Sequence, residues 1–96
     1  MSIGEIISGK RSAIEQLAAR YGVGNLRIFG SVARGDAGPD SDLDLLVELA
    51  PGMTLLRHAA FERELQELLG RKVHVVSERG LRPRVRERMV SEAVPL

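Results

Sequence analysis

Two aspartates, Asp42 and Asp44, stand two residues apart at the start of the apolar segment 41–49, SDLDLLVEL. Alternate side chains of an extended strand share a face, so both carboxylates are expected on one face, with Leu43 and Leu45 on the other. Two like charges held side by side are unfavourable unless a cation lies between them. Mg²⁺ suits such a pair because it takes one or two carboxylates together with substrate phosphates. Taken alone, however, an aspartate pair of this kind is as often a solvated strand end.

The residues before the aspartates carry groups typical of a phosphate-binding turn, in the segment 29–38, FGSVARGDAG. Gly30 allows a phosphate to approach the backbone, and the Ser31 hydroxyl can hydrogen-bond it. A short helix beginning at Ser31 would direct its N-terminus at the anion. Arg34 adds a planar fork of donors within one helical turn. The glycine–serine turn followed by the aspartate pair is much more specific than either half.

The elements that position these residues follow from apolar periodicity and from the glycines and prolines that interrupt it. Besides a short turn or helix at Ser31, we predict helices at 2–21, 54–69 and 81–94 and strands at 25–30, 41–49 and 72–77. Thr54 is expected to cap the middle helix and Gly70 to end it, and Pro83 fits the first turn of the last helix. That last helix is predicted from apolar residues at four-residue spacing: Leu81, Val85, Met89 and Ala93.

Composition restricts the class of protein. The chain has 96 residues, which predicts one domain over 1–96, and 44% hydrophobic with 28% charged residues is typical of a globular protein. Cysteine is absent, which excludes disulfides and thiolate metal sites. No apolar run approaches the roughly 20 residues that span a bilayer, and no signal peptide is visible. We therefore expect a soluble cytoplasmic protein that does not bind a membrane.

Charge is distributed unevenly around a net value of +1. Residues 36–56 contain five acidic residues and no basic one, whereas 71–96 contain seven basic residues and three acidic ones. The last predicted helix carries arginines at alternate positions: Arg82, Arg84, Arg86 and Arg88. They predict a solvated or partner-facing surface, and direct nucleic-acid binding is not expected because the net charge is near neutral and only three residues are aromatic. Asp36 and Asp40 are expected as turn residues, and His58 as a solvated helix residue.

With these residues in place, the segment GSVARGDAGPDSDLDLLVEL (30–49) resembles the signature of the DNA polymerase beta superfamily of nucleotidyltransferases. Size and element order are most similar to its minimal members, which are commonly encoded beside a helical HEPN-type partner as a toxin–antitoxin pair. The resemblance implies an α+β nucleotidyltransferase fold, α-β-α-β-α-β-α, with a small mixed sheet backed by helices. It also implies that Gly30 and Ser31 hold the triphosphate of ATP and that Asp42 and Asp44 bind Mg²⁺ or Mn²⁺.

The activity implied by the resemblance is attack of a hydroxyl on the α-phosphorus of ATP with release of pyrophosphate. Minimal members resemble enzymes that transfer AMP to a tyrosine of the toxic partner and thereby silence it. The family places a third catalytic carboxylate on the next strand, where this chain has His74 in the segment RKVHVVSE (71–78). Neutral imidazole suits Zn²⁺, Cu²⁺, Ni²⁺ or iron better than Mg²⁺.

Three interpretations of His74 remain open at this point. Strand alternation places His74 and Val76 on one face, and Val73 and Val75 on the other, so the imidazole faces the aspartates if the register holds. It would then be a ligand or base in an altered catalytic site alongside Asp42 and Asp44. Alternatively, the chain is a catalytically impaired antitoxin that neutralises its partner by binding. In the third interpretation, the register differs and His74 is a structural histidine.

Overall fold

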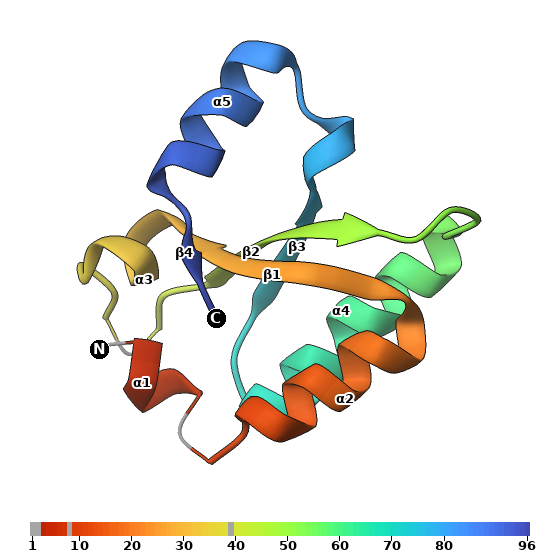
Figure 1. The fold of residues 1–96 in the computed structure, drawn as a ribbon. Coiled ribbons are helices and arrows are strands. Elements are labelled where there is room, and N and C mark those ends of the chain that lie inside the picture. Colours follow the sequence, from red (N-terminus) through yellow and green to blue (C-terminus); the bar gives the residue numbers. More distant parts are fainter. Residues whose placement is uncertain (1–2, 8, 39) are drawn as a thin grey trace.

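One mixed sheet forms the centre of the computed structural model, which describes residues 3–7, 9–38 and 40–96 (Figure 1). Within those residues the sheet has four strands in the order β3-β2-β1-β4. The strands are β1 (Val23–Phe29), β2 (Leu43–Leu49), β3 (Val73–Ser77) and β4 (Val94–Pro95). β1 pairs antiparallel with β2 and with β4, whereas β2 and β3 are parallel. The predicted small mixed sheet is therefore confirmed.

The helices lie on both sides of this sheet. They are α1 (Ile3–Ile6), α2 (Arg11–Tyr21), α3 (Gly30–Arg34), α4 (Leu55–Leu69) and α5 (Pro83–Glu92), with a 3₁₀ turn η1 (Glu78–Gly80). α2 and α4 lie side by side against one face of the sheet, while α5 projects away from it on the other side (Figure 1). Among the described residues, no helix combines the length and apolar character needed to cross a bilayer.

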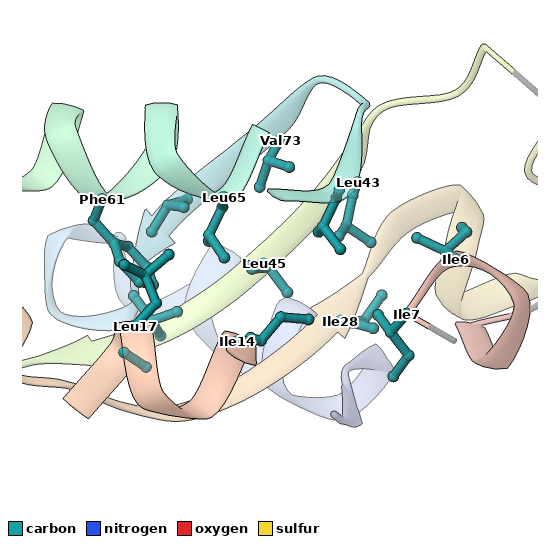
Figure 2. Close-up of a cluster of buried hydrophobic side chains, with 14 of the residues drawn as sticks. Ile6, Ile7, Ile14, Leu17, Ile28, Leu43, Leu45, Phe61, Leu65 and Val73 are labelled. Atoms are coloured by element: carbon teal, nitrogen blue, oxygen red, sulfur yellow. The ribbon is translucent and has the colours of Figure 1, made fainter. Parts of the chain in front are cut away.

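The hydrophobic core fills the space between the sheet and the pair α2 and α4. Leu43, Leu45 and Val47 all point from β2 into this space because alternate residues of a strand share a face. Figure 2 shows Leu45 of β2 surrounded by side chains from both helices, including Phe61, which is completely buried. Burying an aromatic or branched aliphatic side chain of this size stabilises a fold by roughly 1.5–3 kcal/mol. This core fixes β2, and with it the aspartates at its start.

Helix α4 matches its predicted span closely. The Thr54 hydroxyl accepts a hydrogen bond from the backbone N–H of Arg57 at 3.1 Å, and Gly70 ends the helix with φ = 62°. The single helix predicted over 2–21 is wrong, since the chain turns between α1 and α2 where Gly9 adopts φ = 70°. Glycine takes this left-handed conformation without steric cost. The turn lets α1 place Ile6 against the core; Ser2, at the start of the predicted helix, lies outside the described residues.

The C-terminal segment differs more from expectation. Instead of one helix over 81–94, the chain forms α5 and then β4, whose Val94 pairs with Ile28 at the edge of β1. None of the residues of α5, all of which the structure describes, is buried, and Val85 is 45% exposed. The segment with four-residue apolar spacing is therefore helical, as predicted, but its apolar side chains do not pack into the core.

An ion-pair network ties α5 to the sheet. Arg27 of β1 donates to Glu78 at 2.6 Å, and Arg86 of α5 donates to the other oxygen of the same carboxylate at 3.0 Å. Arg27 and Glu78 are both buried, with 9% and 8% of their surface exposed. Sequence spacing does not reveal this network, because the paired residues lie 51 and 8 positions apart along the chain. The two guanidinium groups lower the pKa of Glu78, chiefly through the hydrogen bond from Arg27.

The Glu78 network predicts how stability depends on pH. Since the folded pKa is lowered from 4.5, the carboxylate stabilises the fold above that pH, and the contribution disappears as pH falls through the lower folded value. We expect the free energy of unfolding of wild type to exceed that of Glu78→Gln at pH 7 and the two to converge in acid. Urea titrations from pH 7 to pH 3 measure this difference. A constant gap across that range would contradict the prediction.

Candidate active site

The turn between β1 and α3 is built around Gly30. β1 ends at Phe29 in an extended conformation, and Gly30 then takes φ = 76° to begin α3 directly. Gly35 ends this helix, also with positive φ, and the backbone N–H of Asp36 bonds to the carbonyl of Ser31 at 2.9 Å. The helix predicted to begin near Ser31 is therefore present. Gly30 and Ser31 occupy its first turn, where backbone N–H groups lack intrahelical acceptors.

Asp44 lies directly against this glycine. It pairs across the antiparallel ladder with Phe29, the residue before Gly30. A Cβ atom added to Gly30 would lie 2.6 Å from Asp44 Oδ2, closer than such atoms approach in folded proteins. The structure thus brings the glycine–serine turn and a strand carboxylate together, although 14 residues separate them in the sequence. Their spacing in the sequence does not by itself predict how closely Asp44 approaches Gly30.

The tight fit at Gly30 predicts a specific effect of Gly30→Ala. Alanine at positive φ costs about 1–2 kcal/mol and the methyl group also displaces Asp44, so nucleotide binding should weaken at least about tenfold. Gly52→Ala is the matched control, because Gly52 also has positive φ (88°) but nothing lies within 4 Å of its added Cβ. Calorimetric titration with ATP measures binding. Equal binding by the two variants would contradict the prediction.

His74 completes this cluster from the neighbouring strand. The parallel register pairs it with Asp44, and its Nε2 lies 2.9 Å from Asp42 Oδ2. Val73 and Val75 on either side are buried in the core, so His74 is on the face predicted by strand alternation. The interpretation that rested on a different register is therefore wrong. Asp42 itself lies just before β2, which begins at Leu43, two residues later than the predicted start at residue 41.

Burial and charge act in opposite directions on Asp44. Desolvation is the largest influence and raises the pKa of its carboxyl group, and the neighbouring Asp42 charge raises that pKa further. The charges of His74 and Arg34 lower it. A carboxylate whose charge is disfavoured by burial and by a second carboxylate is a group that a cation would stabilise.

The remaining candidates lie around this centre. The Nε of Arg34 donates to Asp36 at 3.1 Å, and because both side chains are more than half exposed the pair is weak and exchangeable. Asp40 is exposed in the turn before β2, as expected for a turn residue. The expectation for His58 is wrong: its Nε2 lies 2.8 Å from the carbonyl oxygen of Val75, and the residue is half-buried.

A family model described as "Nucleotidyltransferase domain" matches residues 10–96. The chain belongs to this nucleotidyltransferase family. The resemblance read from the segment 30–49 is therefore confirmed.

Two relatives match this nucleotidyltransferase over 98% of its length. A "Putative protein adenylyltransferase" of Methanocaldococcus jannaschii is 39% identical over 94 residues, which cover 97% of that protein. The "Protein adenylyltransferase MntA" of Thermococcus cleftensis is 33% identical over 94 residues, 95% of its length.

Solved structures share the fold of the nucleotidyltransferase. The "Structure of putative minimal nucleotidyltransferase" superposes with a TM-score of 0.85 at 53% identity, covering 96% of this chain and 94% of that chain. The "Crystal structure of the toxin-antitoxin with AMP-PNP" superposes with a TM-score of 0.77, covering 90% of this chain and 71% of that chain. Because the two sequences are only 19% identical, this match shows a common fold and nothing more.

Whether the nucleotidyltransferase residues suit a divalent cation can be judged from the donor set. Asp42 and Asp44 both carry hard carboxylate oxygens, and Asp44 lies beside the backbone of Gly30. Among the described residues, no group of three or more carboxylate, imidazole or thiol side chains is arranged to hold a metal ion. Mg²⁺ is commonly bound by one or two carboxylates while substrate phosphates supply further ligands. The residues therefore fit a magnesium ion that arrives with a triphosphate.

One positioning residue of the nucleotidyltransferase was missed from sequence. Arg71 donates from Nη1 to the backbone carbonyl of Ser41 at 2.7 Å, which fixes the chain immediately before Asp42. The carbonyl of the next residue, Lys72, accepts the N–H of Leu43 at 2.9 Å. These two bonds hold Asp42 between them. In the sequence, Arg71 is distinguished only by its position directly after Gly70, the residue predicted to end the preceding helix.

Proposed function

We propose that this nucleotidyltransferase transfers AMP from ATP to a tyrosine hydroxyl of a HEPN-type helical toxin, and acts as its antitoxin. The observation that carries the proposal is the convergence of Asp44 on the backbone of Gly30, next to Asp42 and His74. Two relatives named protein adenylyltransferases, 39% and 33% identical, support AMP transfer to a protein. A toxin–antitoxin structure with AMP-PNP has the same fold, which supports the nucleotide and the kind of partner.

In this proposal the two sides of the site have different tasks. Gly30 and Ser31 bind the triphosphate through the backbone N–H groups of the first turn of α3 and the Ser31 hydroxyl. The Arg34 guanidinium leaves its ion pair with Asp36 and donates to a phosphate oxygen instead. Asp42 and Asp44 hold Mg²⁺ or Mn²⁺. When bound, the cation neutralises charge that develops on the phosphate oxygens.

The transfer step is an in-line displacement at the α-phosphorus. The tyrosine oxygen forms a bond to that phosphorus, the bond to the bridging oxygen of the β-phosphate breaks, and pyrophosphate leaves with the electron pair. An ionised Asp42 can only accept a hydrogen bond, so Nε2 of His74 donates to it and Nδ1 is the basic nitrogen of the neutral ring. His74 Nδ1 receives the proton that the tyrosine hydroxyl loses.

The hydrogen bond between His74 and Asp42 also favours a second candidate. It occupies one oxygen of a candidate metal ligand, and the position lacks the third carboxylate that the family uses. A protein that keeps the fold and nucleotide binding but not chemistry would neutralise the toxin by contact alone.

One experiment distinguishes the two candidates directly. The protein is incubated with ATP labelled at the α-phosphate, Mg²⁺ or Mn²⁺, and the helical protein encoded beside it. We expect label on the partner, mapped to a tyrosine by mass spectrometry. Absence of label with both metals, while the complex still forms, would reject transfer and favour neutralisation by binding.

A further inference from the structure

The strand that carries His74 lies at an edge of the sheet. In the order β3-β2-β1-β4, β3 has β2 on one side and, among the residues that the structure describes, no strand on the other. The carbonyl of Lys72 accepts the N–H of Leu43, so even-numbered residues of this segment direct their backbone groups toward β2. Alternation then directs the backbone groups of Val73 and Val75 outward, away from the sheet. An edge strand of this kind is held by backbone hydrogen bonds on one side only, and its outward N–H and C=O groups can pair with another chain.

Helix α4 supplies partners for these outward groups. Gln66 Oε1 accepts the N–H of Val73 at 3.1 Å, and Glu62 Oε2 accepts the N–H of Val75 at 2.8 Å. His58 Nε2 lies 2.8 Å from the Val75 carbonyl, to which it donates. α4 lies directly against β3 (Figure 1).

The spacing of these three side chains explains how one helix can follow a strand edge. His58, Glu62 and Gln66 are four residues apart, so they form a stripe along one side of α4. The neighbouring stripe, Phe61, Leu65 and Leu69, is buried in the core and fixes the rotation of the helix. The core packing of α4 therefore aims the polar stripe at the edge of β3.

We infer that His58, Glu62 and Gln66 act as a substitute strand, and that Glu62 and Gln66 are positioning residues for His74. The two amide groups they hold, those of Val73 and Val75, belong to the residues immediately before and after His74. A strand that slipped by one residue would turn His74 to the opposite face. The outer bonds thus keep the imidazole opposite Asp44 and within reach of Asp42. The catalytic part of this inference rests on the proposed function, whereas the structural part does not.

Amide hydrogen exchange in the wild-type protein tests the structural part first. Outward-facing amides of an uncapped edge strand exchange rapidly because only water bonds to them. We expect the Val73 and Val75 amides to be protected in NMR exchange experiments. Rapid exchange of both would overturn the inference without any variant.

Substitution of Glu62 tests the cap residue by residue. In Glu62→Ala we expect the Val75 amide to exchange about tenfold faster or more, because a hydrogen bond to a charged acceptor is lost. Glu62→Gln keeps a carbonyl oxygen at the same position and should restore protection. Glu67→Ala removes an exposed carboxylate from the same helix and is the matched control. Unchanged exchange of Val75 in Glu62→Ala would contradict the inference.

The consequence for His74 has its own readouts. The ring resonances of His74 should shift in Glu62→Ala and not in Glu67→Ala at the same pH. With ATP, Mg²⁺ and the partner, kcat should fall in Glu62→Ala and recover in Glu62→Gln, while KM for ATP stays constant because Gly30 and Ser31 are untouched. If the protein transfers no AMP, the resonance shift still decides whether Glu62 positions His74. Unmoved His74 resonances would reject the positioning role.

Discussion

Replacement of Asp44 by asparagine, alone or combined with Asp42→Asn, is expected to lower AMP transfer by about a thousandfold or more. Asparagine has nearly the same shape but carries no charge, so it cannot hold the cation that neutralises the triphosphate. The effect should be larger for transfer than for ATP binding, since in the proposed function Gly30 and Ser31 bind the triphosphate through the backbone and hydroxyl, without the carboxylates. Transfer of α-labelled phosphate to the partner measures the rate.

Loss of activity in Asp44→Asn should not result from unfolding. Burial raises the pKa of Asp44, so at neutral pH its charge opposes folding, and removing that charge should leave the protein at least as stable in the absence of divalent cations. Glu48→Gln is the control on the same strand, because Glu48 is exposed at the far end of β2. If the double variant Asp42→Asn, Asp44→Asn forms the complex and still neutralises the toxin, the binding antitoxin is the correct candidate.

Replacement of His74 by aspartate is expected to increase AMP transfer with Mg²⁺, by about a hundredfold on the scale of metal-site substitutions. The parallel register places residue 74 beside Asp44, so the new carboxylate would join the oxygen ligands that Mg²⁺ prefers. It would also remove the hydrogen bond that occupies Asp42 Oδ2. Initial rates at saturating ATP, compared with wild type, measure the gain.

Metal dependence of stability provides a second measurement for His74→Asp. Three neighbouring carboxylates repel one another, so the variant should unfold at a lower temperature than wild type without divalent cations. Mg²⁺ should then raise its unfolding temperature more than it raises that of wild type, because a ligand that binds only the folded state stabilises it. His74→Asn removes the imidazole without adding charge and is the control. Aspartate at position 74 can accept the tyrosine proton as the imidazole does. If both variants transfer AMP more slowly than wild type, a carboxylate at position 74 does not replace the imidazole and the prediction is wrong.

The accuracy of the sequence predictions varied with the range of the interactions behind them. Helix α4 was predicted within one residue because Thr54 and Gly70 cap it locally. The boundary between α1 and α2 at Gly9 was not predicted, because apolar residues continue at helical spacing on both sides of this glycine. The strand β4 was not predicted, because a two-residue strand forms only where β1 presents a free edge. α5 was predicted as a helix, but its link to the sheet is the bond from Arg86 to Glu78, which also pairs with the distant Arg27.

The sequence by itself determined the family, the short helix that begins at Gly30 and Ser31, and the alternation that places His74 on the opposite face of its strand from Val73 and Val75. Those features depend on spacing within one turn or one strand, where backbone geometry alone dictates direction. Only the tertiary structure decided that Asp44 lies against Gly30, that His74 bonds to Asp42 across 32 residues, and that α4 holds the edge of β3. These contacts depend on strand register and helix rotation. Strand register and helix rotation are fixed only when distant segments pack together in the core, so the spacing of residues within one element does not predict them.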